Sequence, residues 1–487
     1  MITARLIISV RFPVVPEVSR QSQSPTSLST VRVRFAPSPT GYLHVGGLRT
    51  ALYNFLFARK NSGRFILRIE DTDRSRLVDG AVDNLLNTLR WAGLEFDEGP
   101  GKEGEAGPYV QSERLPLYRK YAGQLLESGT AYYAFDTPEE LEQMRKEREQ
   151  LRVPPKYDRR ALRLSPGEVR RKLEAGDPYV IRMKSPDKET IAFDDVVRGR
   201  VEFDSDLLDD QILLKSDGYP TYHLANVVDD RLMGITHVIR GEEWLSSTPK
   251  HVLLYRFFGW ELPTFAHLPL LLNPDKSKLS KRQGDVAVED YRQKGYLPEA
   301  LLNFVALLGW NPGDERELFS LDELVKEFTL DRVGKSGAVF NVEKLNWLNG
   351  QHVRQKSDVE LLVLVKRRIQ EPGESIGLPD DSRLLRIIGV MRERATFVGD
   401  FVEKCRYFYE APVSYDPAGV AKRWKPGVAE QLRNLGEAFL ALQDSRAEDF
   451  EEVVRKTAES LQVKPAELIH PLRLAVSGVT AGPGLYD

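Results

Sequence analysis

The sequence has almost no cysteine and no long hydrophobic run, and both absences restrict the class of protein that it encodes. Cys405 is the only cysteine among 487 residues, which excludes an internal disulfide framework and a zinc site built from several cysteines. No apolar run reaches the length that spans a membrane. We therefore expect a protein without membrane segments that works in a reducing compartment.

An excess of charge of one sign is also missing. Lys and Arg number 69 and Asp and Glu number 72, which gives a formal net charge of −3. This balance argues against a generally basic nucleic-acid-binding protein but allows a basic patch on one face. Hydrophobic residues make up 41%, as in ordinary globular proteins, and the length predicts roughly two to four domains.

Residues 1–30 are poor in acidic residues and contain no motif. They include Arg5, Arg11, Arg20 and six serines, but only one acid, Glu17. We expect a disordered N-terminal extension, either a natural tail or an over-long start, on a cytoplasmic protein. An organellar transit peptide has a similar composition, and that alternative would place the protein in a mitochondrion or plastid.

The first clear secondary-structure pattern follows this extension. It predicts a strand, a loop, a helix and a second strand at 31–35, 36–47, 48–59 and 64–69. Such an order forms the right-handed crossover of a doubly wound parallel sheet, whose ligands bind at the carboxyl ends of the strands. Arg34, His44 and Glu70 all fall at that edge, which indicates a nucleotide-type site.

Two loops have the composition of phosphate-binding elements. In the first, Gly46 and Gly47 allow close backbone approach at a helix start, and His44 can donate to a phosphate oxygen. The second loop, 273–282, follows a predicted buried strand at 265–272 and contains four cations, of which Lys278 and Lys281 could stabilise leaving pyrophosphate. A structural turn and a solvated basic loop are the simpler explanations of each motif alone, whereas the pair favours a nucleotide site.

These loops resemble the two signature motifs of class I aminoacyl-tRNA synthetases, HIGH and KMSKS, which this sequence writes as HVGG and KLSKR. Further blocks are similar to the glutamyl/glutaminyl subgroup, namely RFAPSPTG, RIEDTD, YHLAN and RGEEW at 34–41, 68–73, 222–226 and 240–244. The resemblance covers roughly residues 31–487 and is dense to about residue 350. The sequence therefore looks like a glutamyl-tRNA synthetase of the bacterial or organellar type.

The resemblance implies how glutamate is held. Glu70 would pair with the α-ammonium, and Arg34 would meet the α-carboxylate through charge-assisted hydrogen bonds. Arg240 would bind the side-chain carboxylate, which favours glutamate over glutamine because a neutral amide leaves a buried arginine unpaired. Tyr222 and Asn226, four residues apart on one expected helix face, would add hydrogen bonds. Two further positions complete the implied glutamate site, Ala36 and Ser38.

The resemblance also implies the ATP site and the reaction. The catalytic residues would be His44, Lys278 and Lys281, which would stabilise the phosphates and the departing pyrophosphate. The implied ATP-binding residues are His44, Gly46, Gly47, Glu243, Trp244, Lys278, Leu279, Ser280 and Lys281. The expected substrates are L-glutamate, ATP with Mg²⁺ and tRNA(Glu), and the expected state is a monomer. Some relatives carry a Cys-x-Cys zinc pair where this chain has Ala-Phe-Asp at 134–136, so we expect no zinc.

The expected fold is α/β, with a Rossmann-like catalytic domain, an α+β insertion and all-α anticodon-binding domains. The expected divisions are an extension at 1–30, the first half of the catalytic domain at 31–109, an acceptor-stem-binding insertion at 110–220, the second half with the KLSKR loop at 221–282, a helical stem-contact domain at 283–355 and a helical anticodon-binding region at 356–487. Relatives continue with one more helix after 471–487, so we expect the C-terminal end to be cut short.

Four other functions are compatible with parts of the sequence. A glutaminyl-tRNA synthetase shares the motifs, but Arg240 and the helical C-terminal half disfavour it. A paralogue that glutamylates a queuosine base lacks an anticodon-binding end, and a small-molecule nucleotidyltransferase would not need the long helical part. An RNA-binding scaffold with an inactive site is disfavoured by His44, Lys278 and Lys281. Whether tRNA(Gln) is also charged depends on anticodon contacts that the sequence does not assign.

Overall fold

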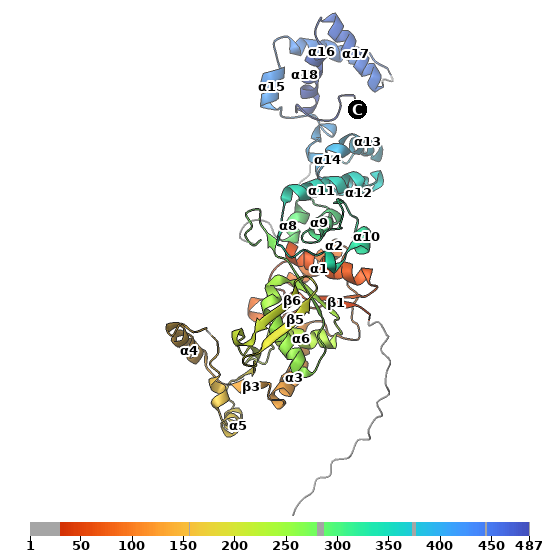
Figure 1. The fold of residues 1–487 in the computed structure, drawn as a ribbon. Helices are drawn as coiled ribbons and strands as arrows, with labels where there is room; N and C mark the ends of the chain where they lie inside the picture. Colours follow the sequence, from red (N-terminus) through yellow and green to blue (C-terminus); the bar gives the residue numbers. More distant parts are fainter. Residues whose placement is uncertain (1–29, 155, 280–286, 373–375, 444–445, 487) are drawn as a thin grey trace, which may run out of the picture. The chain divides into compact units, whose positions relative to one another are not determined.

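The computed structural model describes residues 30–154, 156–279, 287–372, 376–443 and 446–486. Residues 31–487 form one compact unit. Within the described ranges, no helix is both long enough and apolar enough to cross a membrane. The structure combines a sheet-based part, called the catalytic part here because the catalytic domain is expected in it, with a helical carboxyl half (Figure 1).

The catalytic sheet consists of two parallel strand pairs and an antiparallel hairpin. The parallel pairs are β1 with β2 and β8 with β9, and β5 joins β9 in parallel and β6 in antiparallel. The Thr236 N–H donates to the Arg32 carbonyl oxygen at 2.9 Å, which brings β1 beside β8. The strands are β1 (Arg32–Phe35), β2 (Arg64–Leu67), β5 (Thr190–Asp195), β6 (Gly199–Asp204), β8 (His237–Gly241) and β9 (Thr264–Leu268).

The chain crosses away from this β1–β8 boundary in both directions, which creates the site's crevice. From β1 it passes through α1 (Val45–Lys60) to β2, and from β8 it passes through α7 (Thr248–Phe258) to β9. Where the strand order reverses in this way, a crevice opens at the carboxyl ends of the strands. The predicted crossover of the doubly wound sheet is therefore confirmed, and its loop lies at a topological switch point.

Helix α1 is fixed from the side opposite the sheet, because its apolar residues pack on the helices that follow the catalytic part. The hydroxyl of Tyr53 donates to the carbonyl oxygen of Ala306 at 2.9 Å, and its ring lies 4.9 Å from that of Phe328. The fully buried Leu48 and Leu52 belong to the same core. The helix that begins at the HVGG motif is thereby held on both faces.

The insertion contains an antiparallel sheet in the order β3-β4-β7. Its first two helices after β3 begin with capping boxes, at Thr137 with Glu140 and at Ser165 with Glu168, which satisfy otherwise unpaired N–H groups. Between β4 and β7 the chain forms β5 and β6, which belong to the catalytic sheet. The insertion elements are α3 (Leu115–Glu127), β3 (Ala131–Ala134), α4 (Pro138–Gln150), α5 (Pro166–Ala175), β4 (Val180–Met183) and β7 (Ile212–Leu214).

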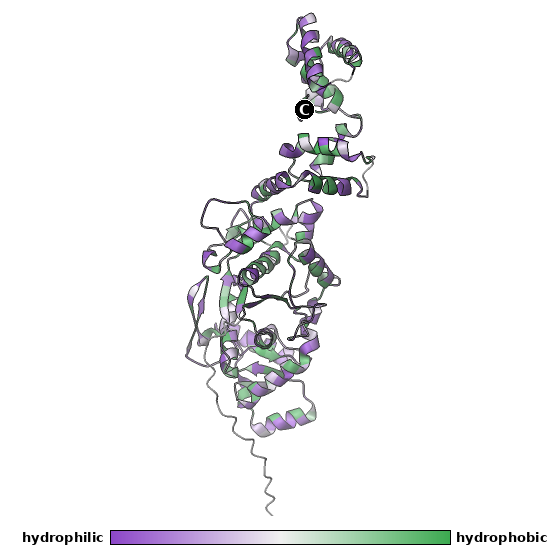
Figure 2. Ribbon diagram, turned by 90° about the vertical axis from the view of Figure 1, so that its right-hand side faces the viewer, coloured by the Kyte–Doolittle hydropathy of each residue, from purple (hydrophilic) through white to green (hydrophobic). Residues whose placement is uncertain are grey.

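The described residues after β9 are mostly helical, as predicted, and include the short pair β10 (Leu271–Leu272) and β11 (Ala338–Val339). The helices in this part carry both hydrophobic and hydrophilic residues (Figure 2), and their apolar faces form two further cores, around Phe401 and around Leu435. The helices are α8 (Val288–Gln293), α9 (Pro298–Ala306), α10 (Leu321–Glu327), α11 (Val342–Gln355), α12 (Asp358–Ile369), α13 (Asp381–Met391), α14 (Asp400–Glu403), α15 (Pro417–Arg423), α16 (Val428–Leu440), α17 (Ala447–Ser460) and α18 (Pro465–Ser477).

Two details differ from the sequence-based expectation. The segment 265–272 is not one strand, because Pro269 lacks the N–H that a continued ladder needs, and the chain ends β9 before it and begins β10 after it. The catalytic sheet is also mixed rather than purely parallel, because β6 adds to it in antiparallel. The expected fold class, an α/β catalytic domain with an insertion and helical domains, is otherwise confirmed. The remaining helices of the catalytic part are α2 (Ala81–Trp91) and α6 (Tyr222–Leu232).

Candidate active site

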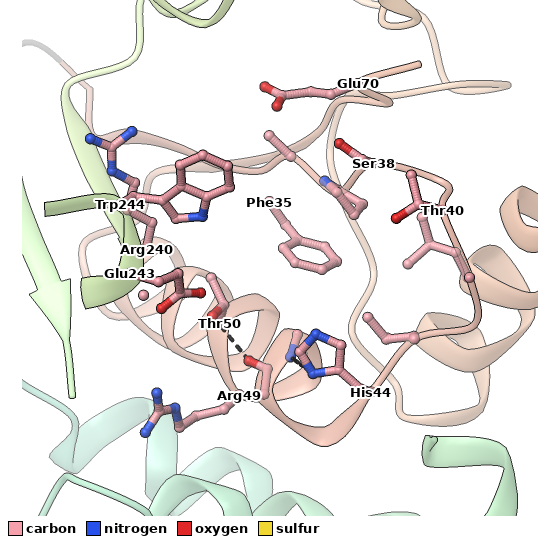
Figure 3. Close-up of a pocket in the computed structure, with 18 of the residues that line it drawn as sticks. Phe35, Ser38, Thr40, His44, Arg49, Thr50, Glu70, Arg240, Glu243 and Trp244 are labelled. Carbon is pink, nitrogen blue, oxygen red and sulfur yellow. Dashed lines mark hydrogen bonds between the residues drawn. The ribbon is translucent and has the colours of Figure 1, made fainter. Parts of the chain in front are cut away.

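A cavity of about 500 Å³ opens at the carboxyl ends of β1 and β8. Every predicted site residue that the structure describes lines it, namely Arg34, Ala36, Ser38, His44, Gly46, Gly47, Glu70, Tyr222, Asn226, Arg240, Glu243, Trp244, Lys278 and Leu279. The two other predicted residues, Ser280 and Lys281, lie outside the described residues. Figure 3 shows Arg240 and Trp244 on one side of the cavity and His44 with Thr40 on the other.

Glu70 is a buried carboxylate held by a buried arginine. Its Oε1 accepts hydrogen bonds from Arg68 Nη2 at 2.9 Å and from Asn226 Nδ2 at 3.4 Å. Only 5% of the Glu70 surface is exposed. Burial raises the pKa of Glu70, and the charges of Arg68 and Arg34 offset this effect only in part. The cavity therefore contains an anion that would be stabilised further by a positively charged ligand group.

Arg34 is oriented by a second buried carboxylate, Asp230. The Arg34 Nε donates to Asp230 Oδ1 at 3.0 Å, and Arg68 Nη1 donates to the same oxygen at 2.8 Å. Burial alone would raise the pKa of Asp230, but Arg34 and Arg68 outweigh it and lower that pKa. Arg68 thus pairs with both Asp230 and Glu70, and Arg34 pairs with Asp230. Such a network fixes the side chains because each buried charge has a partner.

The neighbouring carboxylate, Asp229, extends this network toward the insertion. Its Oδ1 accepts from Arg114 Nε at 2.7 Å, and its Oδ2 accepts from the hydroxyl of Tyr118 and from Gln111 Nε2, both at 2.8 Å. Asp229 and Asp230 are consecutive residues of α6. One turn of this helix therefore connects the end of the cavity that contains Glu70 and Arg34 to the start of the insertion.

Arg240 is another buried arginine that lines the cavity. Its Nη1 donates to the hydroxyl of Tyr222 at 2.7 Å and its Nη2 donates to Thr248 Oγ1 at 2.9 Å. Its Nε donates to His267 Nε2 at 3.1 Å, and His251 Nδ1 lies 3.4 Å from Nη1. Among the described residues Arg240 forms no ion pair. The guanidinium thus carries a buried positive charge whose hydrogen-bonding partners are neutral groups.

The histidines around Arg240 are held in their neutral form. Burial lowers the pKa of His267, His251 and His223, and the last falls to about 3 with Lys250 and Arg240 contributing. Protonating any of them would place a second positive charge beside Arg240. Neutral imidazoles can accept hydrogen bonds from the guanidinium without cancelling its charge.

Aromatic side chains cover this end of the cavity. The rings of Tyr222 and Trp244 lie 4.3 Å apart at 35°, and 39% of Trp244 is exposed. Glu243 lies beside Trp244 in the 3₁₀ helix Glu242–Ser247. A Cβ at Gly241 would lie 2.2 Å from Glu243 Oε2. The glycine at the end of β8 therefore lets the Glu243 carboxylate fold back over the strand.

His44 occupies the N-cap of α1. Its Nδ1 accepts a hydrogen bond from the Gly47 N–H at 3.1 Å, which leaves the proton of a neutral ring on Nε2, as a donor to an anion needs. A Cβ at Gly46 would lie 3.0 Å from the His44 ring, and one at Gly47 would lie 2.6 Å from a Leu43 methyl. The glycines thus permit the packing of the cap itself, a role that the sequence alone did not indicate.

Lys278 lies on a tight hairpin after β10. The Leu279 N–H donates to the Leu271 carbonyl oxygen at 2.9 Å, and the Asn273 N–H donates to the Ser277 carbonyl oxygen at 2.8 Å. The side chain of Lys278 is exposed at the cavity wall. This position suits a cation that meets phosphate at the mouth of the site.

Several residues that shape the site were missed by the sequence analysis. Arg68 and Asp230 orient Glu70 and Arg34, whereas Thr248 and His267 bind Arg240. A histidine within the apolar run around His267 was a usable signal, because a buried polar side chain needs a partner. The partners themselves come from segments that are far apart in the sequence, so no local pattern indicated them.

Comparisons with known proteins agree with this geometry. Residues 30–347 match the family described as tRNA synthetases class I (E and Q), catalytic domain, and residues 360–487 match an anticodon binding domain. A glutamate–tRNA ligase of Chloroherpeton thalassium is 57% identical over 94% of each chain, and that of Chlorobium chlorochromatii is 55% identical over the same share.

Solved structures lead to the same family. The crystal structure of a glutamate tRNA ligase from Elizabethkingia meningosepticum, in complex with its amino acid, is 44% identical with a TM-score of 0.89. The match covers 94% of this chain and 96% of that one. The chain therefore belongs to the glutamate and glutamine subgroup of the class I tRNA synthetases.

Proposed function

We propose that this chain activates L-glutamate with ATP and transfers it to the 3′-terminal adenosine of tRNA(Glu). One observation carries the choice of glutamate. Arg240 presents a buried guanidinium whose partners among the described residues are all neutral, in the same cavity as the buried carboxylate of Glu70. A ligand with an ammonium and a separate carboxylate satisfies both charges, whereas glutamine would leave Arg240 without an anion.

The remaining contacts orient the amino acid. Arg34, held at its Nε by Asp230, would meet the α-carboxylate. Asn226, which already bonds Glu70, and the hydroxyl of Tyr222 would add hydrogen bonds near the α-ammonium and the side chain. Ala36 and Ser38 line the same wall. Because these groups are fixed by one another before the ligand arrives, little ordering accompanies binding.

The first chemical step needs no nucleophile from the protein. A glutamate α-carboxylate oxygen attacks the α-phosphorus of ATP, the bond to the bridging oxygen of the β-phosphate breaks, and pyrophosphate leaves. His44 Nε2–H and the ammonium of Lys278 would stabilise the charge that develops on the phosphates. Glu243 and Trp244 would border the adenosine. ATP enters with Mg²⁺ as its substrate complex.

The second step completes the ligation. A hydroxyl of the terminal ribose of the tRNA attacks the carbonyl carbon of glutamyl-adenylate, and AMP leaves. The helical region at 356–487 is proposed to bind the anticodon, and the insertion is proposed to hold the acceptor end. We further propose a cytoplasmic monomer that needs no zinc.

ATP–pyrophosphate exchange tests this function. The exchange would be measured with glutamate or glutamine, each with and without tRNA(Glu). Exchange with glutamate that is stimulated by tRNA is the expected result. Exchange with glutamine at comparable efficiency would overturn the role of Arg240, and no exchange in any mixture would overturn the function itself. Charging of tRNA(Glu) and tRNA(Gln) transcripts would then define the tRNA range.

A further inference from the structure

Three buried side chains form a line across three neighbouring strands behind the cavity. Arg240 on β8 is the register partner of His267 on β9, and β9 pairs with β5, which ends at Asp195. Arg240 Nε donates to His267 Nε2 at 3.1 Å, and His267 Nδ1 lies 2.6 Å from Asp195 Oδ2. No more than 5% of any of the three is exposed.

This line has one consistent placement of protons. The Arg240 Nε always carries a hydrogen, so His267 Nε2 must be the acceptor and the ring proton must lie on Nδ1. His267 Nδ1–H then donates a hydrogen bond to Asp195 Oδ2. Backbone N–H groups of Val197 and Arg198 donate to Asp195 Oδ1 at 3.0 and 2.8 Å, which holds the carboxylate in place. Asp195, on the side of His267 away from Arg240, therefore determines the tautomer of His267.

We propose that His267, with its tautomer fixed by Asp195, is a positioning residue for amino-acid specificity, because it aims Arg240 at the ligand's side-chain carboxylate. This inference rests on the proposed function. The imidazole separates Asp195 from Arg240, so that the carboxylate does not pair directly with the guanidinium. Arg240 is thereby oriented by a neutral acceptor and keeps its charge for the ligand.

The position of the contacts on Arg240 supports this role. His267 binds the Nε, while Thr248 and Tyr222 take one hydrogen each from Nη2 and Nη1. The guanidinium has five N–H donors in a rigid plane. Because His251 Nδ1 also lies 3.4 Å from Nη1, one N–H on Nη2 remains for an incoming carboxylate. Without the Nε contact the plane could rotate about its side-chain bonds, and a carboxylate would meet it in poor geometry.

A matched pair of substitutions separates positioning from packing. In His267→Gln the side-chain amide oxygen can replace Nε2 as the acceptor for Arg240. In His267→Asn the side-chain amide N–H can replace Nδ1–H as the donor to Asp195, but the acceptor for Arg240 is lost. We expect the KM for glutamate to rise by about tenfold to a hundredfold in His267→Asn and by no more than about threefold in His267→Gln, as for loss or retention of a hydrogen bond to a charged group.

Asp195→Asn tests the tautomer. In this variant the asparagine amide N–H would face His267 Nδ1, which would then have to accept. The ring proton of His267 would move to Nε2, where two donors, Nε2–H and the Arg240 Nε–H, would face each other. We expect this variant to raise the KM for glutamate by about tenfold, with kcat and the KM for ATP each changing less than about threefold. In the His267→Gln background Asp195→Asn should add almost nothing, because glutamine has no tautomer to set.

All variants would be assayed by exchange with glutamate and with glutamine, and their thermal unfolding would be recorded. A preference for glutamate that falls in His267→Asn and Asp195→Asn but persists in His267→Gln supports the proposal. Equal losses in His267→Asn and His267→Gln, or additive effects of Asp195→Asn, would overturn it in favour of a packing role. If the unsubstituted chain shows no glutamate-dependent exchange, the proposed function itself fails.

Discussion

The two ends of the cavity differ in how much of their structure exists before a ligand binds. At the proposed glutamate end, Arg34, Glu70 and Arg240 are buried and each is bonded to other buried side chains. At the proposed phosphate end, His44 and Lys278 are exposed and lie on loops. Distinguishing a carboxylate from an amide requires charges fixed in a dry site, whereas phosphate needs only cations that can reach it.

This comparison predicts different kinetic signatures for the two ends. Substitutions at the buried end should affect the KM for glutamate and its preference over glutamine, because they disturb a preformed binding site. Substitutions at the exposed end should lower kcat with little change in the KM for glutamate, because the phosphate contacts are needed most in the transition state.

Arg240→Gln should have the largest effect. It removes the only charge proposed to meet the side-chain carboxylate, and we expect kcat/KM for glutamate to fall by about 10³-fold, as for a buried charge pair with one partner removed. Exchange kinetics with both amino acids would measure the change. Arg256→Gln is the matched control, since Arg256 pairs with Glu189 on the exposed side of α7. A similar loss in both variants would contradict the assigned role.

Lys278→Ala should lower kcat by about 10²-fold to 10³-fold, as for removal of one group that stabilises transition-state charge. The KM for glutamate should stay within about twofold, which is the opposite pattern to that of Arg240→Gln. Lys276→Ala is the control, because Lys276 is an exposed lysine of the same loop that does not line the cavity. If Lys278→Ala instead raised the KM for glutamate without lowering kcat, the two ends of the cavity would not have different kinetic roles, and the comparison would be refuted.

Glu70→Gln should reduce kcat/KM for glutamate by about tenfold to a hundredfold, the range for a lost hydrogen bond to a charged group. It should also change the pH profile. Only the ionised Glu70 can pair with an ammonium, and burial raises the pKa of Glu70, so activity should fall on acidification at a higher pH than for an ordinary carboxyl. This acid-side fall in activity should disappear in Glu70→Gln, in which only the titration of the substrate's carboxylates at lower pH remains.

Trp244→Ala should have the smallest effect. Trp244 contacts Tyr222 with its ring tilted and is partly exposed, so we expect the KM for ATP to rise by about threefold to tenfold, as for the loss of one aromatic contact. Trp347→Ala is the control, because Trp347 is an exposed tryptophan of α11 outside the cavity. An unchanged KM for ATP, measured by exchange at saturating glutamate, would exclude Trp244 from the adenosine pocket.

Local sequence patterns were sufficient for the elements that bear the site. The alternation at 31–35 and the apolar face at 48–59 predicted β1 and α1, and the four-residue spacing of Tyr222 and Asn226 correctly placed both on α6. Segments whose end depends on one residue were predicted less well. Pro269 divides the expected strand at 265–272, because the residues on both sides are equally apolar and only the missing N–H stops the ladder.

The site divides in the same way between sequence and tertiary structure. The sequence by itself determined which charged groups stand at the ends of β1, β2 and β8, because strand periodicity and loop motifs are local properties. Only the tertiary structure decided their partners, since His267, itself bonded to Asp195, reaches Arg240 and Asp230 reaches Arg34 from elements distant along the chain. The energy of a buried charge depends on those neighbours, so the specificity of the site is a property of the fold.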